Sequence, residues 1–166
     1  MYKVDEYVVH VSGGICQIKS IGPIAISGAD KNKQYYFLSS LKTAGSKVYV
    51  PVDNDLAMRP INTEDDINKL VQEFPSISET VIEDEKHREL VYKDIIKGCN
   101  LYEIAGLIKN IHVRKVKRLE EGKKPTATDE KYYKVMEDNF ISEIAFVLGK
   151  SKPEIKDWLA DELANA

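Results

Sequence analysis

The chain has 166 residues, a formal net charge of −3 at pH 7 and a charged fraction of 31%. This length suffices for one medium domain or two small ones, and no apolar run approaches the roughly 20 residues that cross a bilayer, which excludes a membrane-spanning protein. Cys16 and Cys99 stand far apart without CxxC spacing, and the first residues, MYKVDEYVV, lack the basic and apolar regions of a signal peptide. We therefore expect a reduced, cytoplasmic protein.

Residues 1–60 alternate apolar and polar side chains in short runs, which is the pattern of β-strands. The runs are separated by Gly13-Gly14, Gly22-Pro23 and Ala44-Gly45, which supply the backbone angles that chain reversals need. Short strands joined by tight turns predict a small β barrel. We expect its five strands at residues 7–11, 15–21, 24–26, 35–41 and 47–52.

The last predicted strand has two different faces. One face consists of three valines that we expect in the core: Val48, Val50 and Val52. The other face carries Lys47, Tyr49 and Pro51. Because Pro51 has no N–H to donate, it places this strand at a sheet edge or at its own end. An edge strand can accept a strand from another protein, so this segment is a candidate interaction site.

Behind residue 60 the apolar spacing changes to three and four, which predicts an all-helical domain of five helices. Their starts are indicated by capping residues, namely Thr63, Asn100, Thr126 or Thr128, and Ser151. Pro75 ends the first helix, and Gly98 and Gly149 are expected to end two others in left-handed caps. The stripes expected to be buried are Ile67, Leu70, Val71 and Phe74; Leu90, Val91 and Ile95; Leu101, Ile104, Ala105, Ile108 and Ile111; Tyr132, Tyr133, Met136, Phe140, Ile144, Val147 and Leu148; and Ile155, Trp158, Leu159 and Leu163.

The charge is unevenly distributed along the chain. Residues 1–60 hold seven basic and five acidic side chains, whereas residues 61–166 hold seventeen and twenty-two. Within this acidic half, residues 109–134 form a basic island of nine basic and four acidic side chains. The island can meet phosphates, or it can be a solvated helix face whose cations suit the helix dipole. Tight DNA binding by the free protein is not expected.

Patterns that support catalysis are poorly represented. No Gly-rich phosphate loop is present, and His10, His87 and His112 lie far apart without metal-ligand spacing. The carboxylate pair Asp65-Asp66 stands where a helix begins, which its charge alone explains. We therefore expect no enzyme, no metal, no cofactor and no small-molecule substrate.

Several segments fall in the order found in CarD-type regulators. They are VDEYVV from Val4, YYFL from Tyr35, VYVPVDN from Val48 and RPI from Arg59, followed in the helical half by Lys97-Gly98 and by Asp129-Glu130-Lys131. The chain resembles a bacterial transcription regulator of the CarD/CdnL family over nearly its whole length. The resemblance implies a Tudor-like or SH3-like β domain at residues 1–60 that binds the RNA polymerase β subunit. It also implies a helical domain at residues 61–166 that contacts promoter DNA at the upstream edge of the bubble and modulates open-complex stability.

The resemblance also carries over individual residues. The positions implied for polymerase binding are Lys47, Val48, Tyr49, Ile24 and Arg59. Those implied for DNA binding, largely through phosphates, are Lys86, Arg88 and Lys131, with Arg114, Lys115 and Lys117 as neighbours.

The chain departs from the family at three places. Family members carry polymerase-contacting arginines near Ile24 and Tyr49, and their first hairpin differs from residues 10–14 here. Where they place a tryptophan that wedges against the bubble edge, this chain has Asp84. The single tryptophan, Trp158, lies on an apolar stripe and is expected in the core.

Two other functions remain open. The departure at Asp84 favours a protein-interaction module that binds polymerase without contacting DNA. Residues 143–158 imitate a helix-turn-helix, which would make the chain a DNA-binding repressor. The supposed reading helix, beginning at Lys152, is acidic overall and therefore a poor surface to lay between phosphates.

Overall fold

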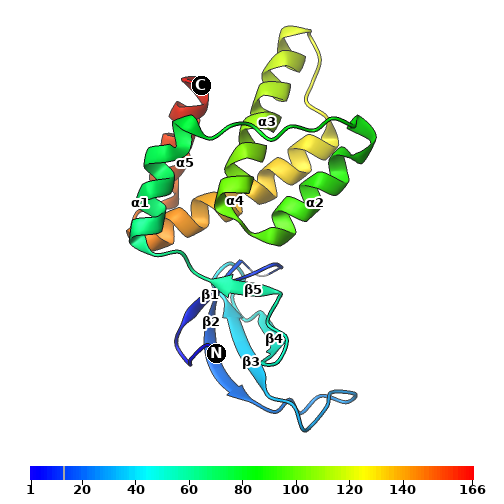
Figure 1. Cartoon of the computed structure of the whole chain (residues 1–166), viewed down its shortest axis with the longest axis vertical. Helices are drawn as coiled ribbons and strands as arrows, with labels where there is room; N and C mark the ends of the chain where they lie inside the picture. Colours follow the sequence, from blue (N-terminus) through cyan, green and yellow to red (C-terminus); the bar gives the residue numbers. More distant parts are fainter. Residues whose placement is uncertain (13) are drawn as a thin grey trace. The chain divides into compact units, whose positions relative to one another are not determined.

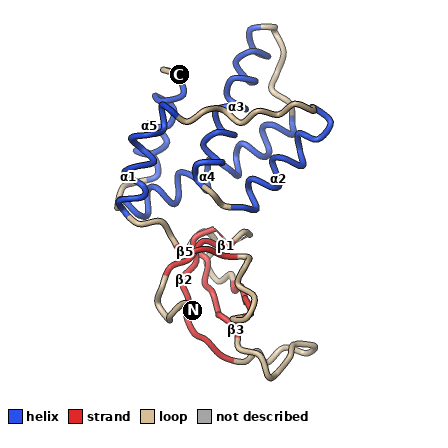
Figure 2. Tube along the Cα trace, viewed as in Figure 1, coloured by secondary structure: helices blue, strands red, loops and turns tan. Residues whose placement is uncertain are grey.

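The computed structural model describes residues 1–12 and 14–166 (Figure 1). Gly13, which belongs to the first predicted turn, lies outside the described residues. The chain divides into two compact units, Met1–Ile61 and Asn62–Ala166. All strands fall in the first unit and all helices in the second, as Figure 2 shows. The predicted α+β fold class is confirmed.

The first unit is one curled antiparallel sheet of five strands (Figure 1). The strands are β1 (Tyr7–His10), β2 (Gly14–Gly22), β3 (Tyr35–Ser40), β4 (Lys47–Pro51) and β5 (Met58–Pro60). Their order is β4-β3-β2-β1-β5, so β4 and β5 form the two edges. The sheet is thus a half-barrel whose edges carry no further strand within the described part of the chain.

One predicted strand is wrong and one was missed. Residues 24–26 form no strand, although Ile24 is buried. Ile26, which alternates with Ile24 in the sequence, is 50% exposed, so the apolar alternation here marks neither a strand nor a buried face. The fifth strand is β5 instead, which pairs with β1 through Val9 and Arg59. Its three residues are too few to show an alternating pattern.

The hydrophobic cluster of the sheet lies on one face. Its buried members are Val8, Cys16, Ile18, Tyr36, Leu38, Val50 and Met58, with Val48 and Val52 packed against them. This confirms the inward valine face of β4. A β-bulge between Ile18 and Ser20 inserts Lys19 opposite β3. Because of this extra residue, Ile18 and Ile21 both reach the core although three positions separate them.

The second unit contains five α-helices and two 3₁₀ turns. They are α1 (Glu64–Glu73), η1 (Phe74–Ser76), η2 (Glu85–His87), α2 (Arg88–Gly98), α3 (Leu101–Glu120), α4 (Ala127–Leu148) and α5 (Lys152–Ala164). The capping predictions are confirmed at Thr63, Asn100, Thr126 and Ser151, whose side chains accept backbone N–H groups of the first turn. Local sequence signals therefore define most helix boundaries.

The second helix differs from its prediction. Its left-handed cap is Cys99, with φ of 55°, rather than Gly98. Leu90, expected to be buried, is 55% exposed, while Arg88 and Tyr92 are buried instead. The side of α2 that packs against neighbouring elements therefore carries polar groups, and the spacing of apolar residues alone cannot predict it.

The core of the helical unit is centred on aromatic rings and the apolar stripe of α3. Trp158 packs against Phe74, with ring centroids 5.2 Å apart, and stacks on Phe140. Trp158 is thus partly buried and packs against the core, as expected. Ile104, Leu107 and Ile108 are almost inaccessible to solvent.

Residues 77–84, which we call the strap, run across α3 (Figure 1). The Thr80 N–H donates to the Gly106 carbonyl at 3.0 Å, and the Asn110 side chain donates to the Thr80 carbonyl at 2.9 Å. The Lys109 ammonium donates to the Ile77 carbonyl at 2.7 Å. A Cβ atom on Gly106 would lie 3.0 Å from the Ser78 carbonyl oxygen, so the strap can approach α3 this closely because Gly106 has no side chain.

Gly106→Ala should therefore destabilise the protein by about 1–2 kcal/mol, because overpacking against backbone outweighs the gain in helix propensity. The matched control is Gly98→Ala, whose added Cβ would meet nothing closer than 3.7 Å. That change should be neutral or mildly stabilising. Denaturant unfolding of both variants measures the difference in the free energy of unfolding. Equal stabilisation of the two would show that the strap can shift away from α3 without loss of stability.

Candidate interaction surfaces

The β4 strand exposes main-chain groups at the edge of the sheet. The Val52 N–H donates to the Gln34 carbonyl at 3.0 Å. Hydrogen-bonded and non-bonded pairs alternate in an antiparallel ladder, so the N–H and C=O groups of Val48 and Val50 point toward β3. Those of Lys47 and Tyr49 therefore point away from the sheet. Within the described residues, no strand covers them.

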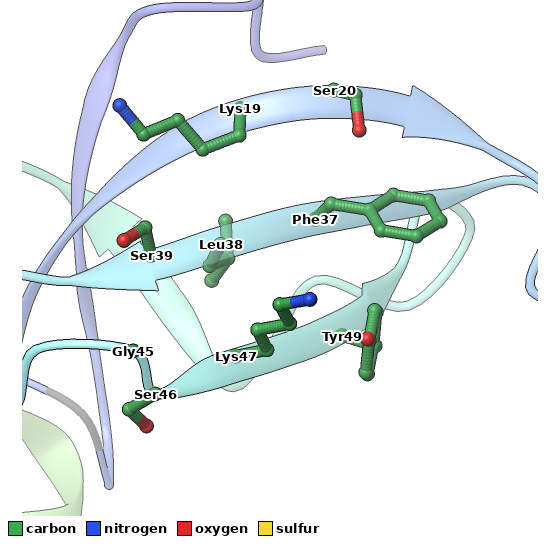
Figure 3. A pocket seen from close by; sticks show the side chains of 9 residues that line it. All are labelled: Lys19, Ser20, Phe37, Leu38, Ser39, Gly45, Ser46, Lys47 and Tyr49. Carbon is green, nitrogen blue, oxygen red and sulfur yellow. The ribbon is translucent and has the colours of Figure 1, made fainter.

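The outer face of β2, β3 and β4 holds a groove of about 370 Å³ beside this edge (Figure 3). Its principal lining residues are Lys19, Ser20, Phe37, Ser39, Lys47 and Tyr49, and we call it the β4 groove. The rings of Phe37 and Tyr49 meet edge to face, with centroids 5.1 Å apart. These two residues form a non-hydrogen-bonded pair, where opposing side chains lie closest.

The residues predicted to bind polymerase do not form one cluster. Lys47, Val48 and Tyr49 lie on β4, with Lys47 and Tyr49 facing out and Val48 facing the core. Arg59 lies on β5 at the opposite edge, where its guanidinium donates to the Pro60 carbonyl at 3.0 Å. Ile24 is buried in the loop after β2. The β4 edge therefore gathers three of the five.

Sequence reasoning missed Lys19 and Phe37 as members of this surface. The alternation within YYFL places Phe37 on the outward face, which was the available signal. Lys19 could not be placed in the same way, because it is the inserted residue of the β-bulge.

In the helical unit, the two predicted DNA-binding arginines contact a buried carboxylate. Asp129 is 4% exposed and accepts hydrogen bonds from the Tyr92 hydroxyl at 2.7 Å and from Arg114 Nε at 2.6 Å. Arg88, also buried, places its Nε 3.9 Å from Asp129 and hydrogen-bonds to the Asn110 side chain. Burial raises the pKa of Tyr92, and its hydrogen bond to Asp129 acts in the same direction.

Glu85 extends this arrangement to the surface. Its carboxylate lies 2.7 Å from Nη1 of Arg114 and 3.5 Å from Nη1 of Arg88. We call these residues the Asp129 network: Glu85, Arg88, Tyr92, Asn110, Arg114 and Asp129. Together they connect η2, α2, α3 and the first turn of α4.

The four predicted lysines are exposed and come from the elements that the Asp129 network connects. Lys86 follows Glu85, Lys115 follows Arg114, and Lys131 stands two residues after Asp129. The Lys131 ammonium lies 5.2 Å from the centre of the Tyr132 ring. Lys117 lies further along α3. The network thus brings into one region segments that are far apart in the sequence.

Asp84, at the position where family members carry a tryptophan, has a local structural role. Its carboxylate accepts the Lys86 N–H at 2.9 Å and lies 2.6 Å from His87 Nδ1. It therefore caps the short η2 turn that precedes α2.

Removing the charge of Asp129 should destabilise the helical unit. Asp129→Asn leaves two guanidinium groups, one of them buried, with only the exposed carboxylate of Glu85 beside them, and breaking a buried ion pair typically costs about 3–5 kcal/mol. Equilibrium denaturant unfolding measures this loss. Glu73→Gln, which alters an exposed partner of Lys69 and Tyr102, is the control and should change stability little. Similar stability of the two variants would contradict the structural role of the network.

No helix in the described part of the chain combines the length and apolar character needed to cross a membrane. Among the same residues, no group of three or more metal-ligating side chains comes together.

A comparison with curated proteins finds no match to this chain. Residues 2–62, however, match the family model of the CarD-like/TRCF RID domain. The match includes all five strands of the sheet and confirms the resemblance for this part of the chain. This is a family of non-enzymatic interaction domains, and its presence supports a transcription-related protein that interacts with RNA polymerase. Over residues 2–62, the chain is therefore similar to the CarD-like/TRCF RID domain family.

Proposed function

We propose that the protein is a cytoplasmic bacterial transcription regulator that binds the RNA polymerase β subunit through the β4 edge. Its helical unit would contact promoter DNA near the upstream edge of the bubble and alter open-complex stability. The observation that carries the proposal is the RID domain match over the sheet whose β4 edge is open.

The β4 edge is suited to accept a strand. Main-chain hydrogen bonds from Lys47 and Tyr49 would supply affinity, and side chains on the exposed face would supply selectivity. Tyr49 is 36% exposed and is the aromatic anchor that a partner can cover. Pro51, without an N–H, limits pairing at the far end of the strand.

On the DNA side, the four exposed lysines are the proposed phosphate contacts, while Arg88 and Arg114 position the segments that carry them. Acidic neighbours such as Glu85 and Glu130 keep the intrinsic affinity low. Tethering to polymerase raises the local DNA concentration to about millimolar, so a few weak contacts suffice. The protein would shift the open-complex population only if these contacts differ between melted and closed promoter.

A second candidate is a module that binds polymerase without touching DNA. The observation that favours it is Asp84, which occupies the wedge position with an acidic cap. The helix-turn-helix hypothesis finds less support, because Lys152 and Lys156 of α5 lie 3.7 Å from Asp138 and Glu137 of α4.

Polymerase capture by the full-length protein tests the β4 edge. Tyr49→Ala should weaken capture by about 1–3 kcal/mol, the range of an aromatic anchor. Lys47→Pro removes an edge N–H donor at the first residue of β4 and should weaken capture more than Lys47→Ala does. Tyr102→Ala, which truncates an exposed tyrosine of the helical unit, is the control. Capture that survives all three β4 changes would place the interface elsewhere.

Charge reversal tests the DNA contacts. The double change Lys86→Glu and Lys131→Glu should shorten open-complex lifetime and reduce the effect on promoter output, because it places acidic groups against phosphates. Polymerase capture should be unchanged. Lys97→Glu with Lys150→Glu changes the net charge equally and serves as the control. If both double variants behave like the wild type, the module without DNA contact is the better description.

A further inference from the structure

We infer that the second half of α3 docks an acidic amphipathic helix of another protein. The docking surface consists of an exposed apolar stripe, formed by Val113, Val116 and Leu119, and of a small pocket beside it. We call these three residues the α3 stripe. This partner is additional to the strand at the β4 edge and the promoter DNA of the proposed function, and it would compete with DNA for Lys115 and Lys117.

The α3 stripe is an apolar face that the helical unit leaves uncovered. Val113, Val116 and Leu119 are 51%, 40% and 52% exposed. Residues three positions apart lie on the same side of a helix, so these side chains form one stripe about two turns long. Single exposed apolar residues are common on protein surfaces, but a contiguous stripe rimmed by charged residues is typical of an interaction site.

The opposite side of this part of α3 is held by polar contacts. Arg114 Nε donates to Asp129 at 2.6 Å, and Arg118 Nε donates to the Lys124 carbonyl at 2.8 Å. In Figure 1, the last turns of α3 extend past the strap, and the segment after Glu120 returns beside them. Because Arg114 and Arg118 are four positions apart and both bond on this side, they keep the α3 stripe turned outward.

A small pocket lies next to the α3 stripe. It has a volume of about 130 Å³, and its lining residues include Ile111, His112, Lys115, Pro125 and Tyr133. His112 stands one helical turn before Val116, so the pocket adjoins the stripe. Its apolar walls are the side chain of Ile111 and the rings of Pro125 and Tyr133. One apolar side chain of a partner can be buried there, as anchor residues are when a helix binds a groove.

The charges around this surface indicate an acidic partner. Lys115 and Lys117 are exposed and lie on the two sides of the α3 stripe. The carboxylates of Asp129 and Glu130 line the pocket instead, where they would repel an acidic side chain. A helix that places an apolar residue in the pocket and acidic residues beside the two lysines complements both parts of the surface.

Basic amphipathic surfaces also bind anionic membranes and DNA. Membrane binding scales with the apolar area that is inserted, and three side chains provide little of it. Phosphates would contact the two lysines but would leave the valines and the leucine in water. We therefore favour a protein helix, and binding measurements separate the three occupants.

The first experiment titrates the full-length protein with a synthetic peptide of about four helical turns, with leucines spaced by three and four and glutamates on both flanks. It should bind at least about ten-fold more tightly than a scrambled peptide of the same composition, because only the periodic peptide forms an apolar face with acidic rims. Equal binding of the two peptides would overturn the inference.

Variants locate this binding on the protein. Val116→Ser with Leu119→Ser should abolish the preference for the periodic peptide. Val81→Ser with Leu90→Ser, which changes two exposed apolar residues elsewhere, is the control and should preserve it. All four side chains are at least 40% exposed, so neither variant disturbs the core. A preference that survives the change of Val116 and Leu119 would overturn the inference.

The second experiment measures binding of the same proteins to duplex DNA and to phosphatidylglycerol vesicles. Lys115→Glu with Lys117→Glu should weaken the periodic peptide at least about ten-fold relative to Lys97→Glu with Lys150→Glu, and should also weaken DNA. Val116→Ser with Leu119→Ser should leave DNA binding unchanged. A loss of DNA or vesicle binding in this serine variant as large as its loss of peptide binding would overturn the inference. The peptide titration needs no polymerase, so the proposed function and the inference can fail separately.

Discussion

The direction of the main-chain groups of β4 is the constraint on which the rest of this account depends. Val48 and Val50 use their N–H and C=O groups to hold β4 to β3, and their side chains fill the core. The same alternation turns the corresponding groups of Lys47 and Tyr49 outward and places their side chains on the exposed face. Edge, anchor and groove are thus consequences of one hydrogen-bonding register. The strand is short and carries a lysine and a proline, features that limit uncontrolled pairing of an open edge.

In the helical unit, the arginines hold helices together, and the exposed lysines are the proposed phosphate contacts. Asp129 engages Arg88 and Arg114 within the unit, so the basic residues closest to its centre hold η2, α2, α3 and α4 together. The exposed lysines on the same elements remain at the surface. This division accounts for a basic island within an acidic domain. It also suits a protein whose DNA affinity needs to be appreciable only when polymerase holds it near a promoter.

Local signals predicted much of the fold, because N-capping side chains act within one helical turn. Thr63, Asn100 and Ser151 all cap helices where the sequence indicates. Features that depend on residues far apart in the sequence were not predicted. The strand β5 forms because it pairs with β1, and α2 buries Arg88 because its guanidinium lies beside Asp129, 41 positions later. The same reason limits the site: the outward face of β4 could be read from its alternation, whereas the cross-strand arrangement of Lys19 and Phe37 could not.

Residue-resolved amide hydrogen exchange, with and without RNA polymerase, tests the central claim most directly. If a polymerase strand adds to β4, the amides of Lys47 and Tyr49 should become protected in the complex. Those of Val48 and Val50, already bonded to β3, should change little. This alternating pattern is the signature of strand addition at this edge. A complex in which Lys47 and Tyr49 exchange as freely as in the isolated protein would contradict the account.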